Sequence, residues 1–258
     1  MRNILSEFWH FFLANLRASY FGAFLLAIFL ITEVVTIPFI GRYDFIFISA
    51  ILYQALALAF RHESLREFSV IIIFHILATG MELFKTSPTI GSWTYPAVAT
   101  AIFAIGTVPL FTGFLYSAIG SYISRAFVFL RLTYKNFPAY YHLWILAILI
   151  YVNFFTHHFI YDIRYILFAY TIILFFKTRV YFQVYKKERS MPFIVTVILT
   201  ALFVWIAENI STFTNIWLYP SQIEYWHLVS FSKMGSWFLL LILSFALVTI
   251  IYRDNISR

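Results

Sequence analysis

The chain of 258 residues has no cysteine and few charged residues. A cysteine count of 0 excludes disulfide bonds, thiol catalysis and metal sites with cysteine ligands. Charged residues make up 11% of the sequence and hydrophobic residues 62%, whereas about a quarter of the residues in an average soluble domain are charged. The low charge and the high hydrophobic content together exclude an ordinary soluble domain.

The familiar motifs of nucleotide and metal chemistry are also missing. The sequence contains no Walker-type glycine loop, no dinucleotide-binding fingerprint, no His-Glu-x-x-His pair and no aspartate-rich pair that could hold a magnesium-bound diphosphate. His157, His158, Glu82 and Glu208 carry donor atoms that suit zinc or iron. Adjacent histidines on a helix diverge by about 100°, however, so both rarely bind one ion. The sequence therefore predicts no metal site and no cofactor, and it disfavours nucleotide-driven transport and dinucleotide redox chemistry.

Long apolar runs, in contrast, are abundant, and each is close to the roughly 20 residues that cross a bilayer. They lie at 20–39, 43–60, 68–85, 97–131, 140–157, 161–179, 191–209 and 233–252. We expect Gly106 and Pro109 to break the fourth run into a short first piece and a full helix. The predicted fold class is an all-α membrane protein with eight transmembrane helices joined by short linkers.

The basic residues orient these spans. The chain has 18 Lys and Arg against 11 Asp and Glu, which gives a net charge of +7. With both termini inside, all but four basic residues fall in cytoplasmic segments, Lys186 and Arg258 among them. The four exceptions are Arg42, Lys85, Arg164 and Lys233. This positive-inside bias predicts a multi-pass plasma-membrane protein with cytoplasmic termini. The excess of positive charge is therefore explained by membrane topology and by contact with anionic lipid, and not by nucleic-acid binding.

Residues 1–19 are predicted to form an amphipathic helix that lies on the inner leaflet before the first span. Asn3, Glu7, His10 and Arg17 fall on one helical face, and the opposite face is apolar and aromatic. The segment lacks the short apolar core and the small-residue cleavage site of a signal peptide.

A motif that combines a glutamate with Trp-x-Tyr-Pro occurs twice. The two copies are Glu82-x-x-x-Thr86 with Trp93-Thr94-Tyr95-Pro96, and Glu208-x-x-x-Thr212 with Trp217-Leu218-Tyr219-Pro220. Chance would produce Trp-x-Tyr-Pro at a given position with a probability of roughly 5 × 10⁻⁵, so two copies indicate an internal repeat. We therefore predict two four-helix repeats, at 20–132 and 140–252. Because each contains an even number of spans, the expected relation is a parallel one, about an axis along the membrane normal.

Ionisable groups inside the spans are the candidates for function, because a charge in hydrocarbon is costly. His75, Thr79, Glu82 and Thr86 follow i, i+4, i+7, i+11 spacing and form one polar stripe on a helix. The repeat would bring Glu33 and Glu82 close to Asn153 and Glu208 in the outer half of the protein. The predicted catalytic residues are Glu82, Glu208 and His75, and the predicted substrate-binding residues are Glu33, Asn153, Trp93, Tyr95, Trp217 and Tyr219. The aromatic residues also fit an ordinary interfacial belt, and the acids also fit hydrogen bonds between neighbouring helices.

The two glutamate motifs carry a resemblance that extends over nearly the whole chain. Together with Lys233-Met-Gly-Ser-Trp237, they resemble the YoaT-like family of bacterial integral membrane proteins. This resemblance implies a bacterial membrane protein and no particular activity.

A shorter stretch is similar to the carotenoid hydratase and heterodimeric lycopene cyclase group. It consists of Glu82, then Gly91-Ser-Trp-Thr-Tyr95, then Gly106-Thr-Val-Pro-Leu110, and it lacks the Pro-Phe-Gly that usually precedes the tyrosines in that group. The resemblance implies proton chemistry on an isoprenoid without a cofactor, with Glu82 as the candidate acid.

The function favoured by these features is the binding or conversion of a hydrophobic isoprenoid or lipid from the outer half of the membrane. Two repeat-related carboxylates among apolar residues suit proton transfer to or from such a molecule. Two alternatives stay open. A small-molecule or ion transporter fits the parallel repeats, and a structural or regulatory membrane protein would need no chemistry. The sequence specifies no oligomeric state and does not decide whether the protein is an enzyme.

Overall fold

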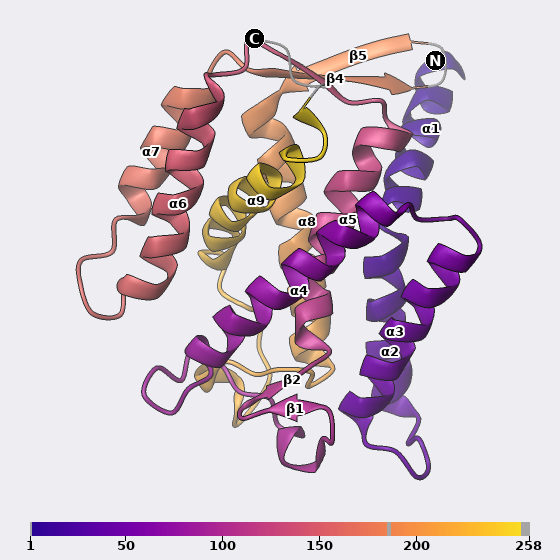
Figure 1. The fold of residues 1–258 in the computed structure, drawn as a ribbon, viewed down its shortest axis with the longest axis vertical. Helices are drawn as coiled ribbons and strands as arrows, with labels where there is room; N and C mark the ends of the chain where they lie inside the picture. The colour runs from indigo at the N-terminus through magenta and orange to yellow at the C-terminus, as the bar shows by residue number, and fades with distance from the viewer. Residues whose placement is uncertain (1, 185–186, 254–258) are drawn as a thin grey trace. The chain divides into compact units, whose positions relative to one another are not determined.

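The computed structural model describes residues 2–184 and 187–253, and Figure 1 shows their arrangement. Lys186 and Arg258, which the charge pattern assigns to the cytoplasmic side, lie outside the described residues. The helices in the described ranges are α1 (Arg2–Ala18), α2 (Tyr20–Val34), α3 (Arg42–Ala59), α4 (Leu65–Lys85), α5 (Thr112–Phe129), α6 (Tyr140–Thr156), α7 (Arg164–Phe175), α8 (Phe193–Phe213) and α9 (Lys233–Thr249). Each of the eight apolar runs thus overlaps one of the helices α2 to α9, although 35–39 and 101–111 within these runs are not helical. Helix α1 forms where the amphipathic helix was predicted.

Three of these helices, α3, α4 and α8, are long and apolar enough to cross a membrane by themselves. The bent pair α1 and α2 would bring the number of candidate spans to four if it counts as one. Helices α6, α7 and α9 are apolar but shorter. With 12 residues, α7 is about 18 Å long, which is less than the roughly 30 Å of a hydrocarbon core. The structure therefore shows an all-helical protein with three to four candidate spans.

The described chain forms two compact units. Unit 1 contains Met1–Ser19, Tyr122–Val204 and Phe231–Arg258, and unit 2 contains Tyr20–Ser121 and Trp205–Ser230. Each unit therefore takes segments from both halves of the sequence. The units do not coincide with the predicted repeats at 20–132 and 140–252. That these two segments are copies of one four-helix repeat, related by an axis along the membrane normal, stays a prediction.

Unit 1 contains a small antiparallel sheet that corrects the prediction of a purely α-helical chain. Its strands are β3 (Thr133–Lys135), β4 (Arg179–Val184) and β5 (Lys187–Pro192), in the order β3-β4-β5. Along β4, the side chains of Val180, Phe182 and Val184 are buried, and the residues between them are more exposed. This alternation is the period of a half-buried strand. In the sequence, this segment falls in the short linker between the apolar runs at 161–179 and 191–209.

Helix α1 packs against this sheet within unit 1. The rings of Phe11 and Phe182 lie 5.2 Å apart, and the Glu7 carboxylate forms ion pairs of 2.5 Å with Lys187 and 2.6 Å with Arg189. Apolar side chains of α1, including Phe8 at 67% exposed, remain uncovered. Helix α6 packs against α7 and α9 in the same unit (Figure 1).

Unit 2 contains α2, α3, α4, the first part of α5 up to Ser121, the last part of α8 from Trp205, and the loop that follows α8. Helix α4 starts with a capping box, in which the Ser64 hydroxyl accepts from Glu67 N and the Glu67 carboxylate accepts from Ser64 N. Between α4 and α5 lie the 3₁₀ turn η1 (Val98–Thr100) and the hairpin β1 (Ala104–Ile105) and β2 (Val108–Pro109). Gly106 has a φ of +57° at the first position of its two-residue loop, which fits a type II′ turn. The predicted break at Gly106 and Pro109 is confirmed.

Candidate functional site

Glu82 lies in the last turn of α4 and accepts hydrogen bonds from three aromatic side chains. The Trp93 indole N–H and the Tyr95 hydroxyl donate to Oε2 at 2.8 and 2.7 Å, and the Tyr116 hydroxyl donates to Oε1 at 2.8 Å. Glu82 is 2% exposed. The carboxylate is therefore held by three neutral donors, two of which come from the Trp-x-Tyr-Pro motif that follows it.

The second copy of the motif repeats the tyrosine contact. The Tyr219 hydroxyl donates to Glu208 Oε1 at 2.6 Å, and Glu208, on α8, is also 2% exposed. In each copy, therefore, the tyrosine of Trp-x-Tyr-Pro binds the glutamate that precedes it on a helix. The same sequence pattern produces the same bond twice.

The two motifs also pair with each other. Thr94 and Leu218, the central residues of the two copies, form an antiparallel β-bridge, in which each backbone N–H donates to the other's carbonyl at 2.9 Å. The rings of Trp93 and Tyr219 meet edge to face, with centroids 6.3 Å apart. Both motifs lie in unit 2, so the predicted site residues Glu82, Trp93, Tyr95, Trp217, Tyr219 and Glu208 come together there.

Tyr43 and Asp44 at the start of α3 fix the backbone around these motifs. The Tyr43 hydroxyl donates to Ile216 O at 2.8 Å. The Asp44 carboxylate accepts from Ile102 N and Phe103 N at 2.9 and 2.8 Å. Both side chains are buried, so α3 anchors the loops that carry both Trp-x-Tyr-Pro copies.

The two motif tyrosines are fixed as hydrogen-bond donors. Burial raises the pKa of Tyr95 well above its usual value, and the charge of Glu82 raises it further. Burial likewise raises the pKa of Tyr219, followed by the charge of Glu208 and, more weakly, that of Glu82. Both phenols consequently stay protonated at neutral pH. Neither Tyr95 nor Tyr219 is therefore the group that loses a proton at this site.

His75 lies on α4, two turns before Glu82, and contacts α5. Its ring centroid is 4.5 Å from that of Phe114, and a Cβ added at Gly113 would lie only 2.5 Å from Nδ1. Among the described residues, Nδ1 is a buried atom without a hydrogen-bond partner. The hydroxyls of Thr79 and Thr86 in the predicted polar stripe donate to the carbonyls of His75 and Glu82. The Thr86 hydroxyl is also 2.6 Å from the Thr107 hydroxyl, in the loop between β1 and β2.

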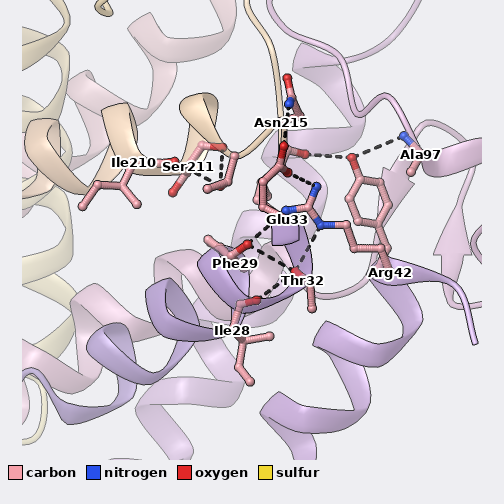
Figure 2. Close-up of polar contacts among 12 residues, drawn as sticks. Ile28, Phe29, Thr32, Glu33, Arg42, Ala97, Ile210, Ser211 and Asn215 are labelled. Atoms are coloured by element: carbon pink, nitrogen blue, oxygen red, sulfur yellow. Dashed lines mark hydrogen bonds and ion pairs between the residues drawn. The ribbon is translucent and has the colours of Figure 1, made fainter. Parts of the chain in front are cut away.

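Glu33, predicted to bind substrate, forms a separate polar network in unit 2 (Figure 2). Its Oε2 is 2.8 Å from Arg42 Nη1, and its Oε1 accepts from Asn215 Nδ2 at 3.1 Å. The side chains of Glu33 and Arg42 are 32% and 20% exposed. Arg42 also donates to Thr32 Oγ1 and Phe29 O. The network joins the end of α2 and the start of α3 to the loop that follows α8.

Asn153, the other predicted binding residue from the second half, lies in unit 1 on α6. Its Nδ2 donates to Asp162 Oδ1 and its Oδ1 accepts from Ile163 N, both at 3.1 Å. The Asp162 carboxylate also pairs with Arg164. Asn153 thus organises the loop between α6 and α7, and none of its described bonds involves Glu208.

Sequence analysis missed Tyr116, which supplies the third donor to Glu82. The serine stripe at Ser117, Ser121 and Ser124 marks a polar face of α5, but Tyr116 lies about 100° away from that face. Trp217 was predicted to bind substrate, but its side chain belongs to the hydrophobic core around Tyr43 and Phe111. Within residues 2–184 and 187–253, no group of three or more His, Asp or Glu side chains could hold a metal ion.

Comparison with known proteins identifies relatives over most of the chain. A family model described as "Protein of unknown function (DUF817)" matches residues 7–245. The chain is also 39% identical over 239 residues to "Uncharacterized protein YoaT" of Bacillus subtilis (strain 168), an alignment that covers 93% of this chain and 89% of that protein. No solved structure matches the chain. The resemblance to the YoaT-like family is confirmed.

Proposed function

The chain belongs to the DUF817 family, and from that premise we propose that it is a membrane-embedded protein that exchanges a proton with a hydrophobic isoprenoid or lipid at Glu82. The observation that carries the proposal is the buried carboxylate with its three aromatic donors. A buried acid in a candidate membrane span is costly, and such residues commonly serve ion or proton pathways.

The proposal includes the placement of the chain in a bacterial plasma membrane. All eight helices α2 to α9 would cross or enter the bilayer as two parallel four-helix repeats, with both termini in the cytoplasm. Three observations support it: the apolar helices at the positions of the eight runs, the large apolar side chains exposed along them, and the bias of Lys and Arg toward one side. The short helix α7 would reach across only together with its flanking residues.

The hydrogen bonds on Glu82 leave one defined position for a proton. A carboxylate oxygen can accept about two hydrogen bonds. Oε2 already accepts from Trp93 and Tyr95, whereas Oε1 accepts only from Tyr116. The remaining position on Oε1 is therefore where the carboxyl group would hold a proton or meet a substrate.

The aromatic rings around Glu82 suit an unsaturated hydrocarbon. When the Oε1 proton moves to a carbon–carbon double bond, the π electron pair forms the new C–H bond, the neighbouring carbon becomes cationic and Glu82 becomes a carboxylate. The faces of Trp and Tyr rings attract a cation. The same carboxylate can then take back a proton from the carbon next to the cation, which restores the acid and shifts the double bond.

The test compares lipids and pigments extracted from cells that express wild type, Glu82→Gln or the control Glu224→Gln, by mass spectrometry. Gln keeps the shape of Glu82 but cannot hold the transferable proton. The proposal expects wild type and Glu224→Gln to give the same profile, because Glu224 is exposed, and Glu82→Gln to accumulate a different species. Identical profiles in all three, with each protein folded, would overturn the proposal and favour a structural role for the network.

The membrane placement has its own test. A reporter that is active only in the cytoplasm should be active when fused after Arg189 and inactive when fused after Tyr219. The opposite pattern would move Glu82 and Glu208 to the cytoplasmic side and would refute the proposed orientation.

A further inference from the structure

Two side chains on α3 and α4 of unit 2 have buried polar atoms that the contacts above leave without a partner. On α4 this is His75 Nδ1, and on α3 it is Gln54, whose amide nitrogen and oxygen both lack a hydrogen-bond partner among the described residues. Gln54 is 3% exposed. Buried polar atoms are normally satisfied by protein or by water. We therefore expect small polar molecules such as water to bind beside these two side chains, between the helices.

The helices α4 and α5 carry further polar groups between these places. The Ser117 hydroxyl donates to Ile71 O and Gly113 O, both at 2.8 Å. The Ser121 hydroxyl donates to Glu63 Oε1 at 3.4 Å. Both serines are fully buried. Hydroxyl groups thus follow α5 along the side that faces α4.

The order of the contacts places these groups in sequence along the helix axis. Glu63, Ile71 and His75 on the α4 side meet Ser121, Ser117 and Gly113 on α5, so the two helices run antiparallel. Gln54 lies near the Glu63 end, since Glu63 N donates to the carbonyl of Ala57, one turn after Gln54. Tyr116 lies between Ser117 and Gly113 on α5, and its hydroxyl donates to Glu82 at the end of α4. From Glu67 to Glu82, α4 rises about 22 Å, which is most of a hydrocarbon core.

We propose that the face between α4 and α5 is a proton path, which leads from Glu63 past Ser121, Ser117 and His75 to Tyr116 and Glu82. The ligands of this path are water molecules and protons. The inference rests on the proposed function in that Glu82 exchanges a proton, and it adds the route by which protons reach it from the opposite end of α4.

Each step of the path conserves protons. The imidazole of His75 takes up a proton on one ring nitrogen and releases one from the other, so its charge is restored after each transfer. The Tyr116 hydroxyl donates its proton to Glu82 Oε1 and receives another from water. His75 and Glu82 are about 10 Å apart along the helix axis, so Tyr116 and water must bridge them.

Two glycines of α5 provide a matched pair of variants. A Cβ at Gly113 would come within 2.5 to 2.8 Å of the His75 ring, and a Cβ at Gly120 would come within 2.9 Å of the Phe74 ring. Gly113→Ala therefore displaces the His75 ring, which carries the proposed proton transfer. Gly120→Ala adds the same methyl group to the same face of α5 but contacts Phe74 and not His75.

The experiment measures proton flux into liposomes that contain the purified full chain and an enclosed pH-sensitive dye, driven by a potassium diffusion potential. Wild type and Gly120→Ala should acidify the lumen faster than protein-free liposomes. His75→Ala, His75→Gln and Gly113→Ala should lose this flux and return to the protein-free rate. His75→Gln keeps hydrogen-bonding capacity without a titratable ring, which separates proton transfer from packing.

A wild-type rate equal to that of protein-free liposomes would overturn the path, as would undiminished flux in His75→Gln and Gly113→Ala. The failure of the path is distinguishable from the failure of the proposed function. If Glu82→Gln alters the cellular lipids but flux is independent of His75, only the path is refuted. If flux requires His75 but the lipids do not change, only the lipid chemistry is refuted.

Discussion

Two carboxylates of unit 2, Glu82 and Glu33, were predicted from the sequence to belong to one site, and they form two different networks. Glu82 is buried and accepts only from neutral aromatic donors. Glu33 is partly exposed and is paired with the Arg42 cation (Figure 2). The Arg42 cation thus holds Glu33 in an ion pair, whereas the donors to Glu82 among the described residues are neutral. Glu82 is therefore the better candidate for proton exchange.

The largest effect in this comparison is expected for Glu82→Ala. The substitution leaves the N–H of Trp93 and the hydroxyls of Tyr95 and Tyr116 without their acceptor. Because each buried donor left unsatisfied costs about 1–3 kcal/mol, we expect the free energy of unfolding to fall by about 3–5 kcal/mol. Thermal unfolding in detergent measures it, with Glu224→Ala as the exposed control. A loss equal to that of the control would show that the three bonds do not hold the fold.

A smaller effect is expected when a single donor is removed. Tyr95→Phe deletes the hydroxyl that binds Glu82 and preserves the ring, which packs edge to face against Tyr43 and Phe111. We expect the free energy of unfolding to fall by about 1.5–3 kcal/mol, the range of a hydrogen bond to a charged group. Tyr141→Phe, at an exposed position, is the control and should change stability by less than about 0.5 kcal/mol. Equal losses in the two variants would contradict the hydrogen bond.

The Tyr95 bond should also depend on pH in one direction. The folded-state pKa of Tyr95 is raised by burial and by Glu82, so the folded protein holds the phenol proton more tightly than the unfolded chain does. The stability from this group is therefore complete below the unfolded pKa of about 10 and is lost as pH rises above it. Unfolding of wild type and Tyr95→Phe should show a constant difference up to about pH 10 and a shrinking difference above it. If the stability difference between wild type and Tyr95→Phe grows above about pH 10, the pKa of Tyr95 is not raised in the folded protein.

The smallest effect is expected in the Glu33 network. Glu33→Gln removes the charge opposite Arg42 but can keep the hydrogen bond from Asn215. Because both charged side chains are partly exposed, we expect a loss of less than about 1 kcal/mol. The difference from wild type should shrink further in about 1 M salt, where the Debye length is near 3 Å. Unfolding at low and high salt measures it, and a large loss independent of salt would mean that Glu33 is not a solvent-screened ion pair.

The sequence predicted the positions of helices well because apolar runs are local signals. The run at 68–85 illustrates this, since it lies within α4. The repeated Trp-x-Tyr-Pro motif also identified most of the Glu82 site. The sequence did not predict the β4–β5 hairpin, because the alternation of buried residues covers only the six residues of β4 and is absent from β5.

Contacts between distant segments could not be predicted in the same way. Tyr116 reaches Glu82 across 34 positions, and nothing in the spacing of the motif points to it. Asn153 was placed near Glu208 by analogy between the repeats, yet its described partners are Asp162 and Ile163. A repeat predicts similar local bonds, such as Tyr95 to Glu82 and Tyr219 to Glu208, but the surrounding packing differs between the copies.

The most direct test of the central claim is whether Glu82 holds and releases a proton. Infrared difference spectra of wild type and Glu82→Gln, recorded through a pH titration in light and heavy water, resolve the C=O stretching band of a protonated carboxyl group. We expect a band that appears as pH falls, shifts in heavy water and is missing in Glu82→Gln, with the band intact in the Glu33→Gln control. If wild type shows no band assignable to Glu82 at any pH where the protein stays folded, the carboxylate is permanently ionised, and proton exchange at this site is refuted.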